Sequence, residues 1–271
     1  MSDLARRAVE PALAAAREAS DLILGVYATP FDVMYKVKDD PVTRADHEAN
    51  ALLCERLARA LPGVPIVAEE SDPSTYAGFA SARAAWFVDP LDGTREFVAR
   101  NGEFAVMIGL AENGRATLGV IVAPAWHRAF VGVVGEGAWE VLPGGARTPI
   151  HVTSRDSFEQ ASIVVSRSRS SPPVVALAAK TAAGKATPHG SSGLKAVLVA
   201  TGVHDVYVQP GPAGMRWDAC ASEALVRAAG GELTDAGGAP IDYAVADLVN
   251  SRGLLATNGR LHRRVVEALK G

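Results

Sequence analysis

The segment AAWFVDPLDGTREF, residues 84–97, carries a run of large apolar side chains that ends at two aspartates. A run of this length predicts a short buried strand. Asp89 and Asp92 follow it, three residues apart, and Gly93 and Thr94 come next. Asp-Pro and Asp-Gly pairs are common in turns, so a simple turn is one interpretation. The other is that a rigid strand holds two carboxylates at the edge of a sheet.

The first half of the chain is predicted to combine helices with antiparallel strands. An alanine-rich helical pattern predicts a helix over 4–27, where Pro11 either fits the first turn or marks a break. A second helix is predicted over 39–63. Two hairpins are predicted, over 103–124 around an Asn-Gly pair and over 128–145.

The second half alternates helix and strand. A loop-like stretch, 144–158, divides the chain near residue 150. Strands are predicted over 161–166, 204–209 and 253–258. Helices are predicted over 172–183, 191–202, 217–231 and 259–271, with 191–202 also compatible with a helix-strand unit. We therefore predict an α+β protein with an α+β half, 1–150, and an α/β half, 151–271.

Further acids stand at the ends of predicted elements. Glu69 and Glu70 follow the apolar strand VPIVA, and Asp218 opens the predicted helix over 217–231. Asp46 lies three residues after Thr43, which also fits a capping box at a helix N-terminus. Asp218 likewise suits the positive end of a helix dipole. Each acid has a structural explanation alone, but strand ends and a helix start can bring all of them to one cleft.

Carboxylates that converge repel one another, so a positive charge is expected among them. Cysteine is absent from these motifs, and histidine enters only as His47. Oxygen ligands alone favour Mg²⁺, and two or three such ions handle phosphate esters. The Thr94 hydroxyl could orient a water with a carboxylate base, or cap the following helix. Gly93 permits a sharp turn that leaves amides facing a phosphate.

Composition excludes several classes of function. The 271 residues carry a net charge of −3, which offers no basic surface for nucleic acid. No apolar run approaches the roughly 20 residues that span a membrane, and the N-terminus has no signal-peptide core. Cys54 and Cys220 are in no metal or redox spacing. We predict a cytoplasmic protein, a monomer or homodimer, whose partners are small molecules rather than nucleic acid or membrane.

Four motifs, in this order along the chain, resemble the inositol monophosphatase superfamily of Mg²⁺-dependent, Li⁺-sensitive phosphatases. They are PVTRAD at 41–46, AEES at 68–71, WFVDPLDGTREF at 86–97 and RWDACASEALVRAAGG at 216–231. The resemblance implies a layered α/β/α/β/α sandwich of the sugar-phosphatase type. Its first half would carry most metal ligands, and its second half would carry Asp218 and substrate specificity.

The resemblance also implies roles for individual residues. The ligands of a first metal would be Glu69, Asp89 and the carbonyl of Leu91; those of a second would be Asp89, Asp92 and Asp218. Asp46 and Thr94 would activate the attacking water, with Glu69 also near it, and Asp46 would touch a third ion through water. The backbone amides of Gly93 and Thr94 would hold the phosphate.

The second half most resembles the 3'(2'),5'-bisphosphate nucleotidases. The resembling segments are 164–171, 189–202, 207–235 and 248–257. They imply that Ser191, Ser192, Lys195 and Arg216 bind the substrate. The family's inositol phosphatases carry an acid shortly before the Trp-Asp pair, whereas residues 206–217 contain no acid and Gln209 stands near that place. A second phosphate would be attracted by Lys195 or Arg216.

Other interpretations of these four residues are structural. Lys195 could extend its ammonium to water, Arg216 could be a solvated loop charge, and the serines could cap a helix. The predicted reaction is removal of the 3'-phosphate of adenosine 3',5'-bisphosphate, with the related phosphosulfate as a second substrate and a role in sulfur metabolism. The alternatives are an inositol-1-monophosphatase and a fructose-1,6-bisphosphatase-type sugar phosphatase. A non-catalytic nucleotide-binding regulator is disfavoured because all four metal carboxylates are present.

Overall fold

The computed structural model describes residues 3–270 apart from 38–39, 168–170 and 182. Its central feature is a seven-stranded sheet in the order β3-β4-β5-β6-β7-β8-β9. The strands are β3 Ile66–Ala68, β4 Ala84–Asp92, β5 Ala105–Glu112, β6 Arg115–Ala123, β7 Arg128–Val133, β8 Gly137–Val141 and β9 Arg147–Pro149. β3 pairs parallel with β4, and the other pairs are antiparallel. The carboxyl ends of β3 and β4, and the acids that follow them, therefore lie at one edge.

A second, five-stranded sheet is built from the second half of the chain, in the order β11-β10-β12-β14-β13. Its strands are β10 Ile163–Ser166, β11 Thr187–His189, β12 Val206–Gln209, β13 Glu232–Thr234 and β14 Leu254–Thr257. β10 is parallel to β11 and β12, whereas β14 is antiparallel to β12 and β13. A separate hairpin joins β1 Val33–Val37 to β2 Asp40–Thr43.

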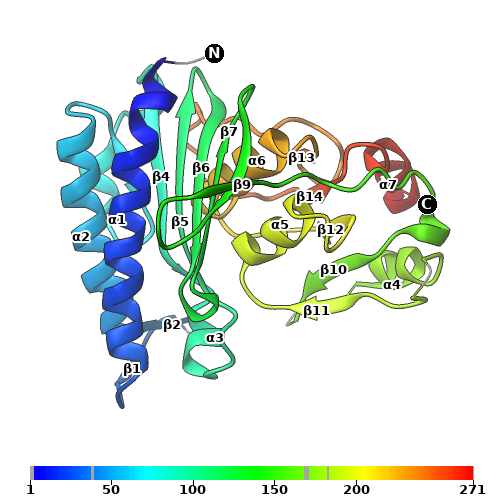
Figure 1. Cartoon of the computed structure of the whole chain (residues 1–271), viewed down its shortest axis with the longest axis horizontal. Coiled ribbons are helices and arrows are strands. Elements are labelled where there is room, and N and C mark those ends of the chain that lie inside the picture. The colour runs from blue at the N-terminus through cyan, green and yellow to red at the C-terminus, as the bar shows by residue number, and fades with distance from the viewer. Residues whose placement is uncertain (1–2, 38–39, 168–170, 182, 271) are drawn as a thin grey trace.

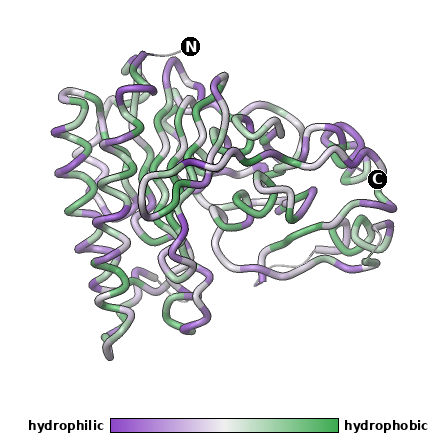
Figure 2. Tube along the Cα trace, in the orientation of Figure 1, coloured by the Kyte–Doolittle hydropathy of each residue, from purple (hydrophilic) through white to green (hydrophobic). Residues whose placement is uncertain are grey.

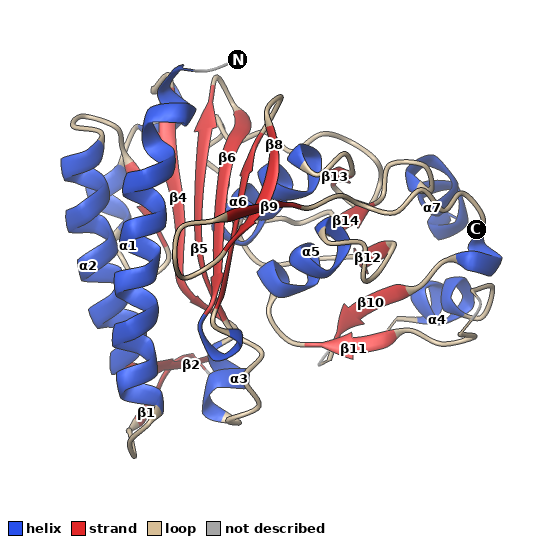
Figure 3. Cartoon of the chain, in the orientation of Figure 1, coloured by secondary structure: helices blue, strands red, loops and turns tan. Residues whose placement is uncertain are grey.

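Helices fill the space between the sheets and cover their outer faces (Figures 1 and 3). α1 Asp3–Tyr27 and α2 Arg44–Ala60 cover the large sheet, and α5 Ser192–Ala200 and α6 Arg216–Ala228 lie between the two sheets. α4 Pro172–Ala178 and α7 His262–Lys270 cover the small sheet. Short helices are α3 Thr94–Val98 and the 3₁₀ turns Pro73–Tyr76, Phe79–Ser81, Pro124–Trp126 and Phe158–Gln160. The predicted α/β/α/β/α layering is confirmed.

Successive side chains along a strand point to opposite faces of its sheet, and so pack in different layers. In β12, Val206 and Val208 pack with α4 and α7, whereas Tyr207 between them faces the middle layer of α5 and α6. α1 buries a stripe of small residues, including Ala8 and Ala12, which lets it lie close to the large sheet. In Figure 2, α1 and α2 alternate between hydrophilic and hydrophobic residues, as expected of helices with one face toward a core.

A row of three glycines fixes the position of α6. Gly109, Gly119 and Gly132 are neighbours across β5, β6 and β7, and α6 crosses them. A Cβ at Gly109 would lie 2.6 Å from Cys220 Cβ, and one at Gly132 would lie 2.6 Å from Leu225 Cα. Only glycine therefore lets the helix approach the sheet this closely. Because α6 begins at Arg216, this row also determines where Asp218 lies.

Several predicted boundaries differ from the structure. The helix predicted over 39–63 begins only at Arg44, because Asp40–Thr43 forms β2 and Thr43 caps the helix. α1 runs through Pro11 without a break. Residues 147–149, predicted as loop, form the edge strand β9. β11 and β13 were not predicted, because Thr187–His189 and Glu232–Thr234, unlike β3, contain no run of apolar residues. None of the described helices is long and apolar enough to cross a membrane.

Candidate active site

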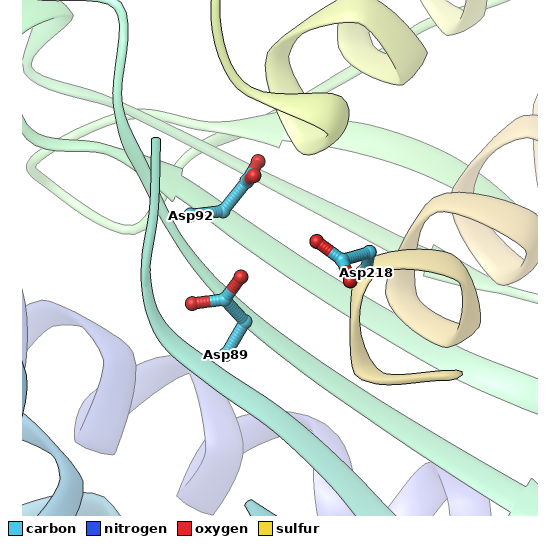
Figure 4. Close-up of side chains that lie close together, drawn as sticks. All are labelled: Asp89, Asp92 and Asp218. Carbon is cyan, nitrogen blue, oxygen red and sulfur yellow. The ribbon is translucent and has the colours of Figure 1, made fainter. Parts of the chain in front are cut away.

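Three aspartates from two distant parts of the chain meet between the large sheet and α6. Asp89 and Asp92 come from the end of β4, and Asp218 comes from the first turn of α6. One oxygen of each lies within 4.8 Å of an oxygen of the others, and Figure 4 shows the carboxylates turned toward one another. They line a cavity of about 250 Å³ together with Glu69 and Thr94. The sequence prediction that these acids converge is thus met by the geometry.

A bulge in β4 explains how residues three apart share one face. In a regular strand Asp89 and Asp92 would point to opposite faces. The pairing with β5 shifts between them, so that Asp89 opposes Met107 whereas Asp92 opposes Ala105. The extra residue turns Leu91 into the core beneath α1 and α2 and brings Asp92 to the side of α6. The Asp-Pro-Leu-Asp spacing is therefore the spacing that a bulged strand requires.

Backbone amides hold one oxygen of each aspartate. The amide of Leu91 donates to Asp89 Oδ1 over 3.0 Å, that of Gly193 to Asp92 Oδ2 over 2.7 Å, and that of Met215 to Asp218 Oδ2 over 2.6 Å. The end of β4, the start of α5 and the N-cap of α6 thereby orient the three carboxylates. Such outer hydrogen bonds are what hold a carboxylate in position for a cation.

The electrostatics of the cluster call for a cation. Burial, and then the neighbouring carboxylates, raise the pKa values of Asp89 and Asp218 well above their usual range. For Asp89 the neighbours include Glu69, which adjoins it at the end of β3. The group consists of oxygen donors alone, which suits a hard divalent cation such as Mg²⁺. The residues present therefore fit the metal that the motifs predicted.

Lys36 was missed by the sequence analysis. It comes from β1, and its Nζ lies 2.9 Å from Glu69 Oε1 and also pairs with Glu70. Burial lowers the pKa of Lys36, but the two carboxylates outweigh this and raise it. Burial raises the pKa of Glu69, with Lys36 acting in the opposite direction. Nothing in the local sequence of this hairpin indicates the contact, because it joins residues 33 positions apart.

Asp46 takes part in the capping box of α2 and also contacts Thr94, so the two interpretations that the sequence left open are compatible. Thr43 caps α2, and its amide and hydroxyl both donate to Asp46 Oδ2 over 2.7 Å. The other oxygen, Oδ1, accepts a 2.9 Å hydrogen bond from Thr94 Oγ1. Burial raises the pKa of Asp46 despite these hydrogen bonds. The capping box thus places a second carboxylate oxygen beside the Thr94 hydroxyl.

Thr94 does not cap α3 with its side chain. The N-cap is Gly93, whose φ of 95° suits glycine, and Thr94 is the first helical residue. Its hydroxyl lies within reach of two acceptors, Asp46 Oδ1 and the carbonyl of Leu91 at 3.2 Å. The helix-cap interpretation of Thr94 is therefore wrong, and its hydroxyl faces the cavity residues instead.

The start of α5 forms the opposite wall of the cavity. Ser191 is the N-cap of α5, and its hydroxyl donates to Asp92 Oδ2. Ser192 lines the cavity, with Oγ 3.4 Å from the carbonyl of Asp218. Lys195 is only 3% exposed, so its ammonium does not extend to water. It donates to the carbonyl of Ser191 and lies 5.1 Å from the centre of the Tyr207 ring.

Arg216 lies apart from these residues. It lines a different cavity, and its guanidinium donates to the carbonyl of Asp242 over 3.0 Å and to the side chain of Asn250. Its predicted contact with substrate stays a prediction. The cavity that holds the three aspartates is also lined by Gln209, named above, and by four residues that the sequence did not single out: Arg95, Glu96, Ser166 and Tyr207. Part of the 164–171 motif lies outside the described residues.

The chain as a whole matches a family of metal-dependent phosphatases. The model of the inositol monophosphatase family matches residues 5–271, and the chain belongs to this family. The family is metal-dependent, and the cluster of Asp89, Asp92 and Asp218 could bind the metal. The predicted family is thus confirmed.

Individual relatives agree with this assignment. The chain is 38% identical to the 3'(2'),5'-bisphosphate nucleotidase CysQ of Escherichia coli strain K12, over 84% of this chain and 90% of that protein. The crystal structure of CysQ from Bacteroides thetaiotaomicron matches with a TM-score of 0.74 and 30% identity, over 92% of this chain and 96% of that one. An inositol monophosphatase from Anabaena (Nostoc) sp. PCC 7120 matches with a TM-score of 0.78 and 29% identity, over 96% and 94%.

Proposed function

We propose that the protein removes the 3'-phosphate of adenosine 3',5'-bisphosphate to give AMP and phosphate, and that it requires Mg²⁺. The related 5'-phosphosulfate is a second substrate in this proposal, which would place the enzyme in sulfur metabolism. The proposal is supported by curated relatives that carry the bisphosphate nucleotidase name and are 30–38% identical over most of the chain.

The observation that carries the nucleotide assignment is Lys195. This residue of α5 lines the same cavity as Asp92 and Asp218. Burial lowers the pKa of Lys195 to about 8, although the two aspartates favour its charged form, so it still carries a positive charge near pH 7. A substrate with a second phosphate would gain from this charge, whereas a neutral inositol hydroxyl would gain less.

The metal-binding residues in this proposal are those of the predicted set: Glu69, Asp89, the carbonyl of Leu91, Asp92 and Asp218. They would hold two or three Mg²⁺ ions. When bound, Mg²⁺ supplies charge neutralisation and Lewis acidity to a phosphate and its attacking water. The backbone amides of Gly93 and Thr94 would hold phosphate oxygens. In the same proposal, residues 1–150 carry most of the metal ligands, and residues 151–271 carry Asp218 and determine substrate specificity. The proposed protein is cytoplasmic and is a monomer or a homodimer.

The residues that move the proton are Thr94 and Asp46. A water beside Thr94 can donate to Oγ1, because that hydroxyl donates its own proton to Asp46 Oδ1 over 2.9 Å. The raised pKa of Asp46 makes it a better proton acceptor near neutral pH than an ordinary aspartate. Asp46 cannot rotate away, since the amide and hydroxyl of Thr43 hold its other oxygen. No covalent enzyme intermediate is needed.

A second candidate is an inositol-phosphate or sugar-phosphate phosphatase. It is favoured by the fit to the Anabaena inositol monophosphatase over nearly the whole chain. Phosphate release from adenosine 3',5'-bisphosphate, inositol 1-phosphate and fructose 1,6-bisphosphate, with Mg²⁺ and with or without Li⁺, separates the candidates. We expect the nucleotide to have the highest kcat/KM and Li⁺ to inhibit. Faster turnover of inositol 1-phosphate would refute the nucleotide assignment.

A further inference from the structure

Ser191 adopts a backbone conformation that serine rarely occupies. Its φ is 54° and its ψ is 130°, which lies outside the left-handed helical region near ψ of about 47°. Other non-glycine residues with positive φ include His127, whose ψ of 38° falls within that region. Conformations of this kind persist only where the surroundings enforce them, and they gather at functional sites. A glycine would adopt it more easily, so the side chain of Ser191 calls for an explanation.

The strained conformation lets one hydroxyl serve two partners. Ser191 Oγ accepts a 3.0 Å hydrogen bond from the amide of Leu194, which caps α5. A serine hydroxyl has a single proton, and here it is donated to Asp92 Oδ2. The cap therefore fixes the hydroxyl oxygen, and the fixed hydroxyl points its proton at the carboxylate.

Gly193 completes the contact with Asp92. Its amide donates to the same oxygen, Oδ2, over 2.7 Å. A Cβ at Gly193 would lie 2.7 Å from Met107 Sδ and 3.3 Å from Asp92 Oδ2, so a side chain would push the helix start away. Both donors come from the start of α5, which sets the orientation of a carboxylate carried by β4.

The carbonyl of Ser191 contacts a second residue that lines the cavity. It accepts from Lys195 Nζ, one turn further along α5. Lys195 also stands over the ring of Tyr207 in β12. The hydroxyl of Ser191 is thus bonded to a carboxylate of the metal cluster, and its carbonyl to the buried ammonium.

We propose that Ser191 is a positioning residue that holds Asp92 in its metal-binding orientation, rather than a contact for the substrate alone. The inference rests on the proposed metal-binding role of Asp92, and not on the identity of the substrate. Loss of the hydroxyl leaves Asp92 Oδ2 with the Gly193 amide and frees the carboxylate to rotate. Loss of such an outer hydrogen bond costs about 10- to 100-fold in metal affinity.

The test is the Mg²⁺ concentration that gives half of the maximal rise in unfolding temperature, measured without substrate. We expect Ser191→Ala and Ser191→Gly each to need about 10- to 100-fold more Mg²⁺ than the wild type. Ser191→Gly relieves the backbone strain, so it keeps the test possible if Ser191→Ala folds poorly. A purely structural serine would change the metal-free unfolding temperature but leave the Mg²⁺ requirement unchanged.

Thr201→Ala is the matched control. It removes another hydroxyl from the same helix region, one that donates to the carbonyl of Val197 at the far end of α5. We expect it to keep the wild-type Mg²⁺ requirement. Wild-type Mg²⁺ requirements in both Ser191 variants would overturn the inference, provided that Asp92→Asn still weakens Mg²⁺ binding. An unchanged requirement in Asp92→Asn would overturn the metal-binding role itself, and with it the inference. Phosphate release from the nucleotide tests the proposed reaction separately.

Discussion

Replacing Gly109 by alanine would place a methyl group against the helix that carries Asp218. The new Cβ would lie 2.6 Å from both Cβ and Sγ of Cys220 and 2.7 Å from the amide nitrogen of Ala221. Ordinary contact begins at 3.4 Å, so α6 or β5 must move by about 0.8 Å, the difference between 3.4 and 2.6 Å. Neither is a free end: β5 is paired on both sides, and α6 is packed between two sheets.

The expected cost follows from this lack of room. Inserting a methyl group into a packed core costs about 1–3 kcal/mol. Each kcal/mol lowers the unfolding temperature of a protein of this size by about 2–4 °C, so we expect a fall of roughly 2–12 °C in thermal unfolding. A shift of α6 also moves Asp218, and misplacement by about 1 Å can reduce turnover roughly 100-fold.

Gly144→Ala is the control, because a Cβ there meets nothing within 4 Å among the described residues. A Gly109→Ala variant that unfolds at the wild-type temperature would show that β5 and α6 have room for the methyl group after all. Reduced stability with wild-type kcat and Mg²⁺ requirement would refute the narrower claim that the glycine row positions Asp218.

Three further predictions follow from the site and the helices. Asp46→Asn should keep the fold, since an amide oxygen still accepts from Thr43, but lower kcat by about 10²- to 10⁴-fold in phosphate-release assays. Because Asp89 and Asp218 have raised pKa values, the metal-free native state binds more protons than the unfolded chain above pH of about 4. The metal-free protein should therefore become less stable as pH rises above about 4. Mg²⁺ displaces the bound protons, so it should bind more tightly over the same pH range. Unfolding curves measured with EDTA or with Mg²⁺ at several pH values test both the fall in stability and the rise in Mg²⁺ affinity. Gly25→Ala, in the last turn of α1 with open space around its Cβ, should raise the free energy of unfolding by about 0.5–1 kcal/mol in denaturant unfolding.

The fold was predictable where the pattern is long and regular. The hairpins over 103–124 and 128–145 are two pairs of strands around tight turns, as predicted. The short strands β11 and β13 and the start of α2 were not predicted correctly. Their boundaries depend on which neighbouring strand supplies hydrogen bonds, and that information is not local.

The carboxylates were predictable because their positions in the motifs carry their chemistry. The contacts around them were not. Lys36 meets Glu69 through the hairpin of β1 and β2, and Ser191 meets Asp92 across 99 positions of the chain. A structural role for a residue also did not exclude a role in the site. Asp46 takes part in a capping box and still accepts a hydrogen bond from the Thr94 hydroxyl. Sequence patterns identified which groups are present, whereas the packing of α5 and α6 determined which of them touch.

We propose that one cavity binds one phosphate of the substrate at the carboxylates and a second phosphate at Lys195. The decisive measurement compares kcat/KM for adenosine 3',5'-bisphosphate with kcat/KM for adenosine 3'-monophosphate, in the wild type and in Lys195→Met. Methionine keeps most of the side-chain volume and removes the charge. We predict that the wild type prefers the bisphosphate and that Lys195→Met loses most of this preference while still hydrolysing the monophosphate. An unchanged preference in Lys195→Met would show that Lys195 does not bind the second phosphate.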